Sequence, residues 1–277
     1  MQSHPIPLVL ADSITQVPDH PRVPRIILCG SHGGRSSGIF ALKKGVHAVI
    51  FNDAGVGKEQ AGIASLSLLE KHGIYAATVD AQTARIGIAA ETQEGIISFV
   101  NRLAGNAGVR VGMPAREAAS ILQKAPVLLL RISSEPPLEW KETLTVIHVS
   151  PKGYRIVAMD SNSQVTPENR KDIILTGSHG GLVGSAPVVK HPVLAAFYND
   201  AGGGKEQAGI SRLPRLQEAG ILGATVDART AQIGIGLETY EYGIISHVNP
   251  LARDWGILPG MAAKEAAGMI LRRLEGG

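Results

Sequence analysis

Cysteine, aromatic residues and long apolar runs are all scarce in this 277-residue sequence. Cys29 is the only cysteine, which excludes an internal disulfide and a cluster of thiolate metal ligands. No apolar run approaches the roughly 20 residues that a helix needs to cross a bilayer, and no charged leader precedes an apolar stretch. We therefore expect a cytoplasmic protein with no membrane partner.

Charge of one sign is lacking too, since the formal net charge is only +3. Aromatic residues make up 4% of the chain and are not interleaved with a basic cluster, so nucleic acid is not an expected partner. Apolar residues make up 44%, enough to fill the core of one large or two ordinary domains. The expected partner is a small-molecule substrate, and assembly into a homo-oligomer stays open.

What the sequence does contain is an internal repeat. Residues 26–94 align without a gap with residues 173–241 at an offset of 147 (179 minus 32), and about 39 of 69 positions are identical. The segment Gly30–Gly34, for example, returns unchanged as Gly177–Gly181, and the offset becomes 148 after Tyr242. We infer that the chain contains two copies of one α/β unit.

Strands and helices alternate in each copy. In the first copy we expect strands at Arg25–Cys29, Val46–Phe51 and Ile74–Val79, a turn at Gly30–Gly34, and helices at Ser36–Lys44, Lys58–His72, Glu91–Leu103 and Pro114–Gln123. Strands that are apolar throughout indicate a parallel sheet covered on both faces. The predicted fold class is α/β, with two tandem pseudo-symmetric repeats, each a mostly parallel three-layer (α/β/α) Rossmann-like sheet.

Between the copies, strands are predicted at Pro126–Ile132 and Thr143–Ser150, the second entering a hairpin with Tyr154–Met159. Such a hairpin strand could bridge the two halves. The predicted division is a first repeat over 1–125, bridging strands over 126–153 and a second repeat over 154–277.

Polar residues follow the predicted strands and are identical in the two copies, whereas apolar core positions have drifted. Because ligands of parallel sheets bind beyond the carboxyl ends of the strands, these residues are the candidate chemistry. We expect the catalytic groups to be His32, Asp53 and Asp80 and their counterparts His179, Asp200 and Asp227.

An imidazole suits general acid or base work near neutral pH, and Asp53 or Asp80 could orient the His32 ring through Nδ1. The alternative for the histidine is a hydrogen-bonded structural role. Asparagine and aspartate after a strand also satisfy loop backbone groups, which is the alternative for those residues.

Substrate anchors are expected near the lysines that follow Gly-x-Gly. Lys58 and Lys205 open predicted helices, where a lysine beside free N–H groups can hold a carboxylate or a phosphate. Arginine changes place between the copies, at Arg85 in the first and Arg229 in the second. The expected substrate-binding residues are Ser31, Asn52, Lys58, Glu59 and Arg85, with Ser178, Asn199, Lys205, Glu206 and Arg229. A solvated lysine is the alternative.

A divalent metal stays open as a cofactor, because one imidazole and nearby carboxylates can form a site; the candidate ligands are His32, Asp53, His179 and Asp200. No nucleotide cofactor is expected. Asn52 stands where a Walker P-loop has its first glycine and Glu59 follows the lysine, and no Gly-x-Gly-x-x-Gly is present in Gly30–Gly34.

These patterns predict a small-molecule enzyme, a hydrolase or lyase that acts on a small polar or anionic substrate bearing a carboxylate or amide. Because fused duplicates imitate homodimers, the site is expected at the interface of the two repeats. The alternative is a non-catalytic protein that binds or senses a metabolite.

Overall fold

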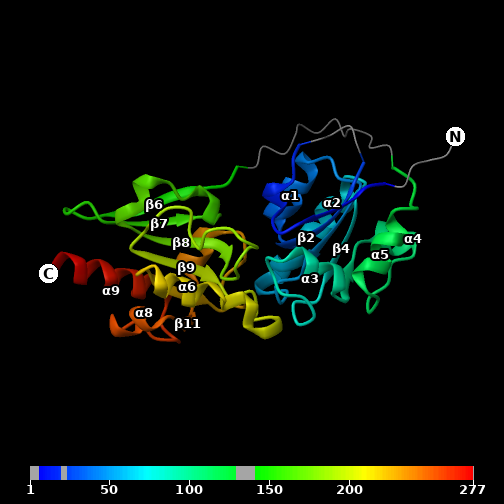
Figure 1. Ribbon diagram of the computed structural model, residues 1–277. Coiled ribbons are helices and arrows are strands. Elements are labelled where there is room, and N and C mark those ends of the chain that lie inside the picture. The colour runs from blue at the N-terminus through cyan, green and yellow to red at the C-terminus, as the bar shows by residue number, and fades with distance from the viewer. Residues whose placement is uncertain (1–5, 20–23, 129–140, 277) are drawn as a thin grey trace. The chain divides into compact units, whose positions relative to one another are not determined.

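The computed structural model describes residues 6–19, 24–128 and 141–276. The chain divides into two units. The first comprises Met1–Val56, Gln60–Trp140 and Gly204–Glu206, and the second comprises Gly57–Glu59, Lys141–Gly203 and Gln207–Gly277. Each unit contains one mixed, mostly parallel β-sheet flanked by helices, so the protein is α/β (Figure 1).

The sheet of the first unit has the strand order β1-β2-β3-β4-β5. Its strands are β1 (Leu8–Ala11), β2 (Ile26–His32), β3 (Ala48–Asn52), β4 (Tyr75–Val79) and β5 (Ile97–Val100). Strands β1 to β4 are parallel, and β5 pairs antiparallel with β4. Every residue of β2, β3 and β4 is buried, which explains why these strands are apolar without alternation.

Helices cover both faces of this sheet. Helices α1 (Arg35–Lys43) and α2 (Ser65–Lys71) pack on one face, against residues that include Ile27 and Val49. Helices α4 (Arg102–Ala107) and α5 (Ala115–Leu122) pack on the opposite face, against residues that include Leu28 and Ile50. Helix α3 (Ala89–Glu94) contacts β2, and short 3-10 helices occur at η1 (Ile14–Gln16) and η2 (Lys58–Ile63).

The sheet of the second unit has the order β11-β10-β9-β8-β7-β6. Its strands are β6 (Leu144–Val149), β7 (Arg155–Met159), β8 (Asp172–His179), β9 (Ala195–Asn199), β10 (Leu222–Val226) and β11 (Ile245–Val248). Strands β7 to β10 are parallel, whereas β6 and β11 are antiparallel edges.

The helices of the second unit are α6 (Arg212–Glu218), α7 (Gly236–Glu241), α8 (Pro250–Asp254) and α9 (Ala263–Gly276), with 3-10 helices η3 (Asn162–Gln164), η4 (Pro167–Lys171) and η5 (Lys205–Ile210). Helix α6 packs on one face of the sheet, and α8 and α9 pack on the other. Among the residues that the structure describes, no helix has both the length and the apolar character needed to cross a bilayer.

Three local predictions are wrong. The predicted turn at Gly30–Gly34 is strand as far as His32, because Gly30 lies against backbone atoms of Gly87 and Ile88 that hold it extended. The predicted helix Lys58–His72 is η2 followed by α2, since Glu59 and Gln60 have left-handed φ angles of +52° and +59°, which an α-helix excludes.

The predicted helix Glu91–Leu103 is also wrong, because it is α3, then strand β5, then α4. Gly95 ends α3, and the Asn101 side chain accepts a hydrogen bond from the Ala104 N–H and so caps α4. Predicted strands Val46–Phe51 and Ile74–Val79 and helices Ser36–Lys44 and Pro114–Gln123 are confirmed within two residues at each end.

The predicted hairpin is confirmed as β6 and β7, with Gly153 donating its N–H to the Ser150 carbonyl. Of the predicted strand Pro126–Ile132, residues 126–128 are not in a strand and the remainder lies outside the described residues, as do residues 20–23 of the loop before β2. The division into 1–125, 126–153 and 154–277 stays a prediction.

Candidate functional site

The polar residues of the predicted site do meet at the carboxyl edge of each sheet. His32 at the end of β2 is in register with Asn52 at the end of β3, which is in register with Val79 before Asp80. The second unit repeats this register, with His179 opposite Asn199. The strand-end positions predicted from the sequence are therefore neighbours within each unit.

The two histidines are buried and hold their own turns together. The Gly34 N–H donates to His32 Nδ1 at 3.1 Å, and the Gly181 N–H donates to His179 Nδ1 at 3.2 Å. Because Nδ1 accepts, the neutral ring carries its proton on Nε2. The prediction that Asp53 or Asp80 orients His32 through Nδ1 is wrong, since a backbone amide occupies that atom.

Burial also lowers the pKa of His32 to about 4. The ionised form is disfavoured because the imidazolium loses its hydration inside the protein. At neutral pH His32 is therefore an uncharged ring, which weakens its case as a general base, because such a base works best with a pKa near the operating pH.

Asn52 and Asn199 brace the loops after the strands. The Asn52 amide donates to the Ala84 carbonyl and accepts from the Ala54 N–H, each at 2.9 Å. Asn199 makes the same two bonds with Ala231 and Ala201. These completely buried amides have their donor and acceptor atoms bonded to backbone.

Asp53 and Asp200 each join two loops within their own unit. Asp53 Oδ1 accepts from the Gly55 and Ala81 N–H groups, each at 3.0 Å. Asp200 Oδ1 accepts from the equivalent amides of Gly202 and Ala228. Burial raises the pKa of Asp53, and the hydrogen bond from Ala81 opposes that shift.

The serines and the last aspartates also bond to groups of their own unit. Ser31 Oγ accepts from the Ile14 N–H, and Asp80 Oδ1 accepts from the Gln82 N–H at 2.7 Å. In the second unit Ser178 Oγ accepts from the Asn162 N–H, and Asp227 pairs with Arg229 at 2.5 Å. The hydrogen bond from Arg229 lowers the pKa of Asp227, although the Arg229 side chain is 85% exposed.

A run of left-handed backbone follows β3 and β9. Positive φ angles occur at Ala54, Gly55, Val56, Gly57, Glu59 and Gln60, and at Ala201, Gly202, Gly203, Gly204, Glu206 and Gln207. Several of these residues carry a Cβ, which crowds the following carbonyl in this conformation. Strained backbone of this kind persists where surrounding contacts impose it, and it clusters at binding and catalytic sites.

Each run carries a lysine whose amide is already bonded. The Lys205 N–H donates to the Ala81 carbonyl at 2.7 Å within the first unit, and the Lys58 N–H donates to the Ala228 carbonyl at 2.8 Å within the second. The N–H of the lysine itself is therefore not one of the free donors expected for an anion at this position, whereas the other N–H groups of the predicted helix start stay a prediction. The ammonium groups, by contrast, reach carboxylates.

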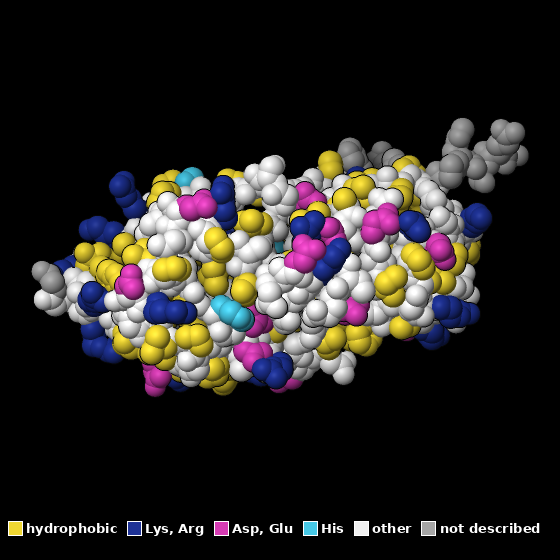
Figure 2. All heavy atoms as spheres, turned by 60° about the horizontal axis from the view of Figure 1, so that its bottom comes forward, with side chains coloured by type: hydrophobic (Ala, Val, Ile, Leu, Met, Phe, Trp, Pro, Cys, Tyr) yellow, Lys and Arg dark blue, Asp and Glu magenta, His cyan; other side chains and the backbone are white. Residues whose placement is uncertain are grey.

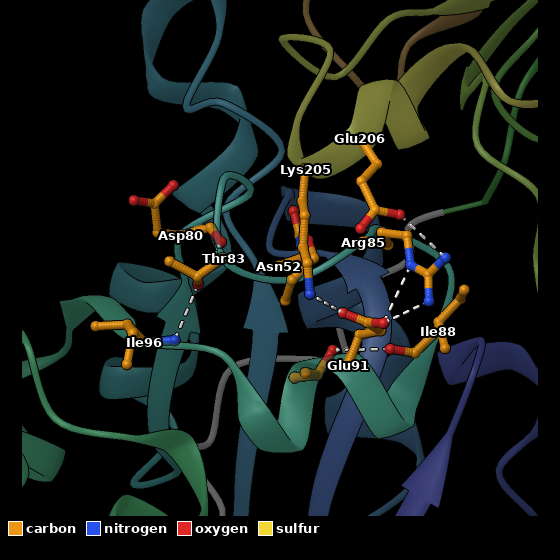
Figure 3. Close-up of polar contacts among 11 residues, drawn as sticks. Asn52, Asp80, Thr83, Arg85, Ile88, Glu91, Ile96, Lys205 and Glu206 are labelled. Carbon is orange, nitrogen blue, oxygen red and sulfur yellow. Dashed lines mark hydrogen bonds and ion pairs between the residues drawn. The ribbon is translucent and has the colours of Figure 1, made fainter.

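In the first unit, two cations hold one carboxylate (Figure 3). Lys205 Nζ lies 2.7 Å from Glu91 Oε2, and Arg85 Nη2 lies 2.5 Å from Glu91 Oε1. Arg85 also reaches Glu206 at 3.4 Å. The Glu91 side chain is only 17% exposed, and the hydrogen bond from Lys205, reinforced by Arg85, lowers the pKa of Glu91.

The second unit has a related cluster with different chemistry. Lys58 Nζ lies 2.6 Å from Glu238 Oε2 and 4.1 Å from the centre of the Tyr242 ring. Gln232 occupies the position equivalent to Arg85, and its amide donates to Glu59 Oε2 at 2.5 Å. A neutral amide thus replaces the guanidinium.

Sequence reasoning missed Glu91 and Glu238 as site residues. A signal was available, since Glu91-Thr92 and Glu238-Thr239 are identical between the copies. Each threonine donates to a strand carbonyl of its own unit, Thr92 to Cys29 and Thr239 to Thr176, so the glutamate is the member of each pair that reaches the lysine.

Over the described residues, no three His, Cys, Asp or Glu side chains lie together in a way that could hold a metal ion. The candidates His32, Asp53, His179 and Asp200 thus have no third ligand of these types beside them within 6–19, 24–128 and 141–276. On the face drawn in Figure 2, Lys and Arg side chains lie among Asp and Glu.

Comparison of the chain with protein-family models, with curated proteins and with solved structures found no match. Two lysine-centred clusters of charged and polar side chains are the candidate ligand-binding groups. The first contains Lys205, Glu91, Arg85 and Glu206, and the second contains Lys58, Glu238, Gln232, Glu59 and Tyr242. A site formed jointly by the two repeats stays a prediction.

Proposed function

We propose that the protein is an enzyme, a hydrolase or lyase, that acts on a small anionic substrate bearing a carboxylate or amide. The observation that carries this proposal is the grip on Glu91, in which Lys205 holds one carboxylate oxygen and Arg85 the other. Cations placed on both oxygens of a carboxylate are the arrangement by which proteins bind carboxylate ligands.

A substrate carboxylate would compete with Glu91 for these two cations. Glu91 would then be released beside the bound substrate, free of the contacts that lower its pKa. A carboxylate released in this way can accept a proton from a water molecule or from a substrate carbon, which is the step that a hydrolase or a lyase requires.

The backbone around the lysine supports this role. Glu206 and Gln207 follow Lys205 with φ angles of +53° and +58°, a conformation that costs on the order of 1 kcal/mol or more for each residue with a Cβ. Stability alone does not favour such a loop. Such a loop is favoured if it has to hold the Lys205 ammonium in a fixed position for a ligand.

The finer description of the fold belongs to the same proposal. We interpret the two units as pseudo-symmetric, Rossmann-like three-layer repeats that arose by duplication, a reading supported by the matching registers of His32 with Asn52 and of His179 with Asn199. The proposal also includes a cytoplasmic location and a small-molecule partner, with no nucleic-acid partner.

The test combines binding and turnover. Small carboxylates, with their esters and amides, are incubated with the protein, and products are sought by mass spectrometry. Glu91→Gln should bind a carboxylate at least as tightly as the wild type, because the internal competitor is gone, and should lose turnover. Lys205→Met should lose both. Unchanged turnover in Glu91→Gln would contradict the proposal.

A matched control is an ion pair that involves the same helix, α3, but not Glu91. Arg116 pairs with Glu94 at 2.9 Å, and both side chains are more than half exposed. Arg116→Gln removes one cation beside α3 without touching Glu91, so it should change neither binding nor turnover. If it weakened binding as much as Lys205→Met, the effect would be one of general charge rather than of the site.

A second candidate is a non-catalytic protein that binds or senses a carboxylated metabolite. It is favoured by one observation, that the strand-end groups of His32, Asn52 and Asp53 are bonded to backbone amides and carbonyls. This reading predicts carboxylate affinity that needs Lys205 and no turnover of any compound tested.

A further inference from the structure

Four positions make the two lysine clusters comparable. At the offset of 147, Lys205 corresponds to Lys58, Glu206 to Glu59, and Glu238 to Glu91. The fourth position differs, because Arg85 in the first unit corresponds to Gln232 in the second. The two clusters therefore share a lysine and two glutamates and differ by one cation.

That cation changes the charge balance. In the first unit Lys205 and Arg85 face Glu91 and Glu206, so two positive charges meet two negative charges. The second cluster has one positive charge, on Lys58, against the carboxylates of Glu238 and Glu59. An incoming anion would meet balanced charge in the first cluster and an excess of negative charge in the second.

The glutamate of the first cluster is also held by more donors than the glutamate of the second. Arg85 holds Glu91 Oε1 through both Nε, at 3.1 Å, and Nη2, at 2.5 Å, while Lys205 holds Oε2. Gln232 donates to Glu59 instead of to Glu238. Among the described residues of the second unit, only the Lys58 ammonium therefore bonds to the Glu238 carboxylate.

A tyrosine with no counterpart in the first copy completes the contrast. Tyr242 is the residue at which the offset changes from 147 to 148, and its ring centre lies 4.1 Å from Lys58 Nζ. Cation–π contact satisfies one side of the ammonium and covers it. The Lys58 side chain, held by Tyr242 and Glu238, is 23% exposed, whereas the Lys205 side chain, held by Glu91, is 36% exposed.

We propose that the first unit holds a binding site for one small carboxylate, that Arg85 is the residue that determines its specificity, and that the second cluster does not take anions. This inference rests on the proposed function, because it assigns the substrate carboxylate to one of the two clusters. The ligand class is a compact mono- or dicarboxylate, gripped on both oxygens by Lys205 and Arg85.

The experiment is isothermal titration of the full chain with sodium malonate, with malonamide as the uncharged control compound. The wild type should bind one equivalent of malonate and no malonamide. Arg85→Gln, which copies the second cluster, should weaken malonate binding at least tenfold. Arg85→Lys keeps the positive charge but loses the paired Nε and Nη2 donors of the guanidinium, so an intermediate loss of malonate affinity is expected. Arg116→Gln should bind like the wild type.

The reciprocal change tests the second cluster directly. Gln232→Arg together with Tyr242→Ala gives the second cluster the cation and the opening of the first, and a second equivalent of malonate should then bind. Two equivalents in the wild type, or full affinity in Arg85→Gln while Lys205→Met loses it, would overturn the inference and leave the proposed function standing.

Failure of the proposed function has a different signature. If neither the wild type nor Glu91→Gln binds malonate or any other small carboxylate, both clusters are structural ion pairs and the inference falls with the function. Thermal unfolding of each variant identifies losses of binding that come from a lost fold. If Arg85→Gln unfolds, Arg85→Lys decides the result. Unchanged malonate affinity in Arg85→Lys would contradict the role given to the paired Nε and Nη2 donors of Arg85.

Discussion

Val56 and Gly203 occupy equivalent positions in the two left-handed loops, with φ angles of +64° and +75°. Glycine adopts this conformation freely, whereas a β-branched residue there is a steric outlier. The first copy therefore holds a valine in a backbone conformation that suits the glycine of the second.

Exchanging these residues should move stability in opposite directions. Val56→Gly should raise the free energy of unfolding by about 0.5–1 kcal/mol, because relief of strain exceeds the entropy that glycine adds to the unfolded chain. Gly203→Val should lower it by about 1–2 kcal/mol, since its Cβ would also lie 3.1 Å from Gln207 Oε1. Urea unfolding measures both, and a loss of stability in Val56→Gly would contradict the prediction.

A methyl group at Gly30 should disrupt the carboxyl edge of the first sheet. Its Cβ would lie 2.6 Å from the Gly87 carbonyl carbon and 2.7 Å from the Asp12 oxygen, both backbone atoms that cannot rotate away. Gly30→Ala should lower the free energy of unfolding by about 2–3 kcal/mol.

The control for Gly30→Ala is Gly105→Ala in helix α4. A Cβ at Gly105 would meet only Val100 Cγ2, at 3.8 Å, and Gly105 has no positive φ. Alanine in a helix favours the folded state, so a gain of about 0.5–1 kcal/mol is expected there. Equal losses in the two variants would show that the close backbone approach at Gly30 is not what restricts the position.

Asn52→Asp should test the hydrogen bonds by which the Asn52 side chain joins the loops that contain Ala54 and Ala84. The change removes the donor to the Ala84 carbonyl and puts a carboxylate into a completely buried position beside Asp53. The expected cost near pH 7 is about 3–5 kcal/mol. The cost should shrink as pH falls, because a protonated Asp regains an O–H donor. The exposed Asn106→Asp change should cost little at any pH, and unfolding curves at pH 7 and pH 5 make the comparison.

His32 should make the protein less stable in mild acid. Its pKa is lowered from 6.5 to about 4 in the folded state, so between these values the unfolded chain binds more protons. Through this group, the free energy of unfolding keeps its full value above pH 6.5 and decreases as pH falls towards 4. The total decrease is at most about 3 kcal/mol. The raised pKa of Asp53 acts in the opposite sense and offsets part of it.

The measurement is the free energy of unfolding from pH 7 to pH 4.5 in the wild type and in His32→Asn, which keeps an acceptor for the Gly34 N–H. The variant should show a flatter dependence on pH, because its amide does not titrate. Identical slopes would mean that His32 is not the group that binds the proton on unfolding.

The sequence by itself determined where the central strands of each copy lie. Runs such as Val46–Phe51 and Ile74–Val79 are mostly apolar and do not alternate with charged residues. Such a composition is typical of a strand buried on both faces of a sheet, so the place of these strands followed from local chemistry. Identity between the copies also marked His32 and Asn52 as strand-end neighbours, because the carboxyl ends of parallel strands share one edge.

Only the tertiary structure decided which loop residues adopt left-handed φ angles and which charged side chains pair with each other. A glycine-rich loop before Lys58 permits a helix, and only contacts such as Lys58 N–H to the Ala228 carbonyl hold Glu59 and Gln60 in the left-handed region. Ion pairing is equally non-local, since Lys205 reaches Glu91 across 114 residues of chain (205 minus 91). Local sequence fixes which charges exist, but the folded backbone sets the distance between them, and the strength of their attraction depends on that distance.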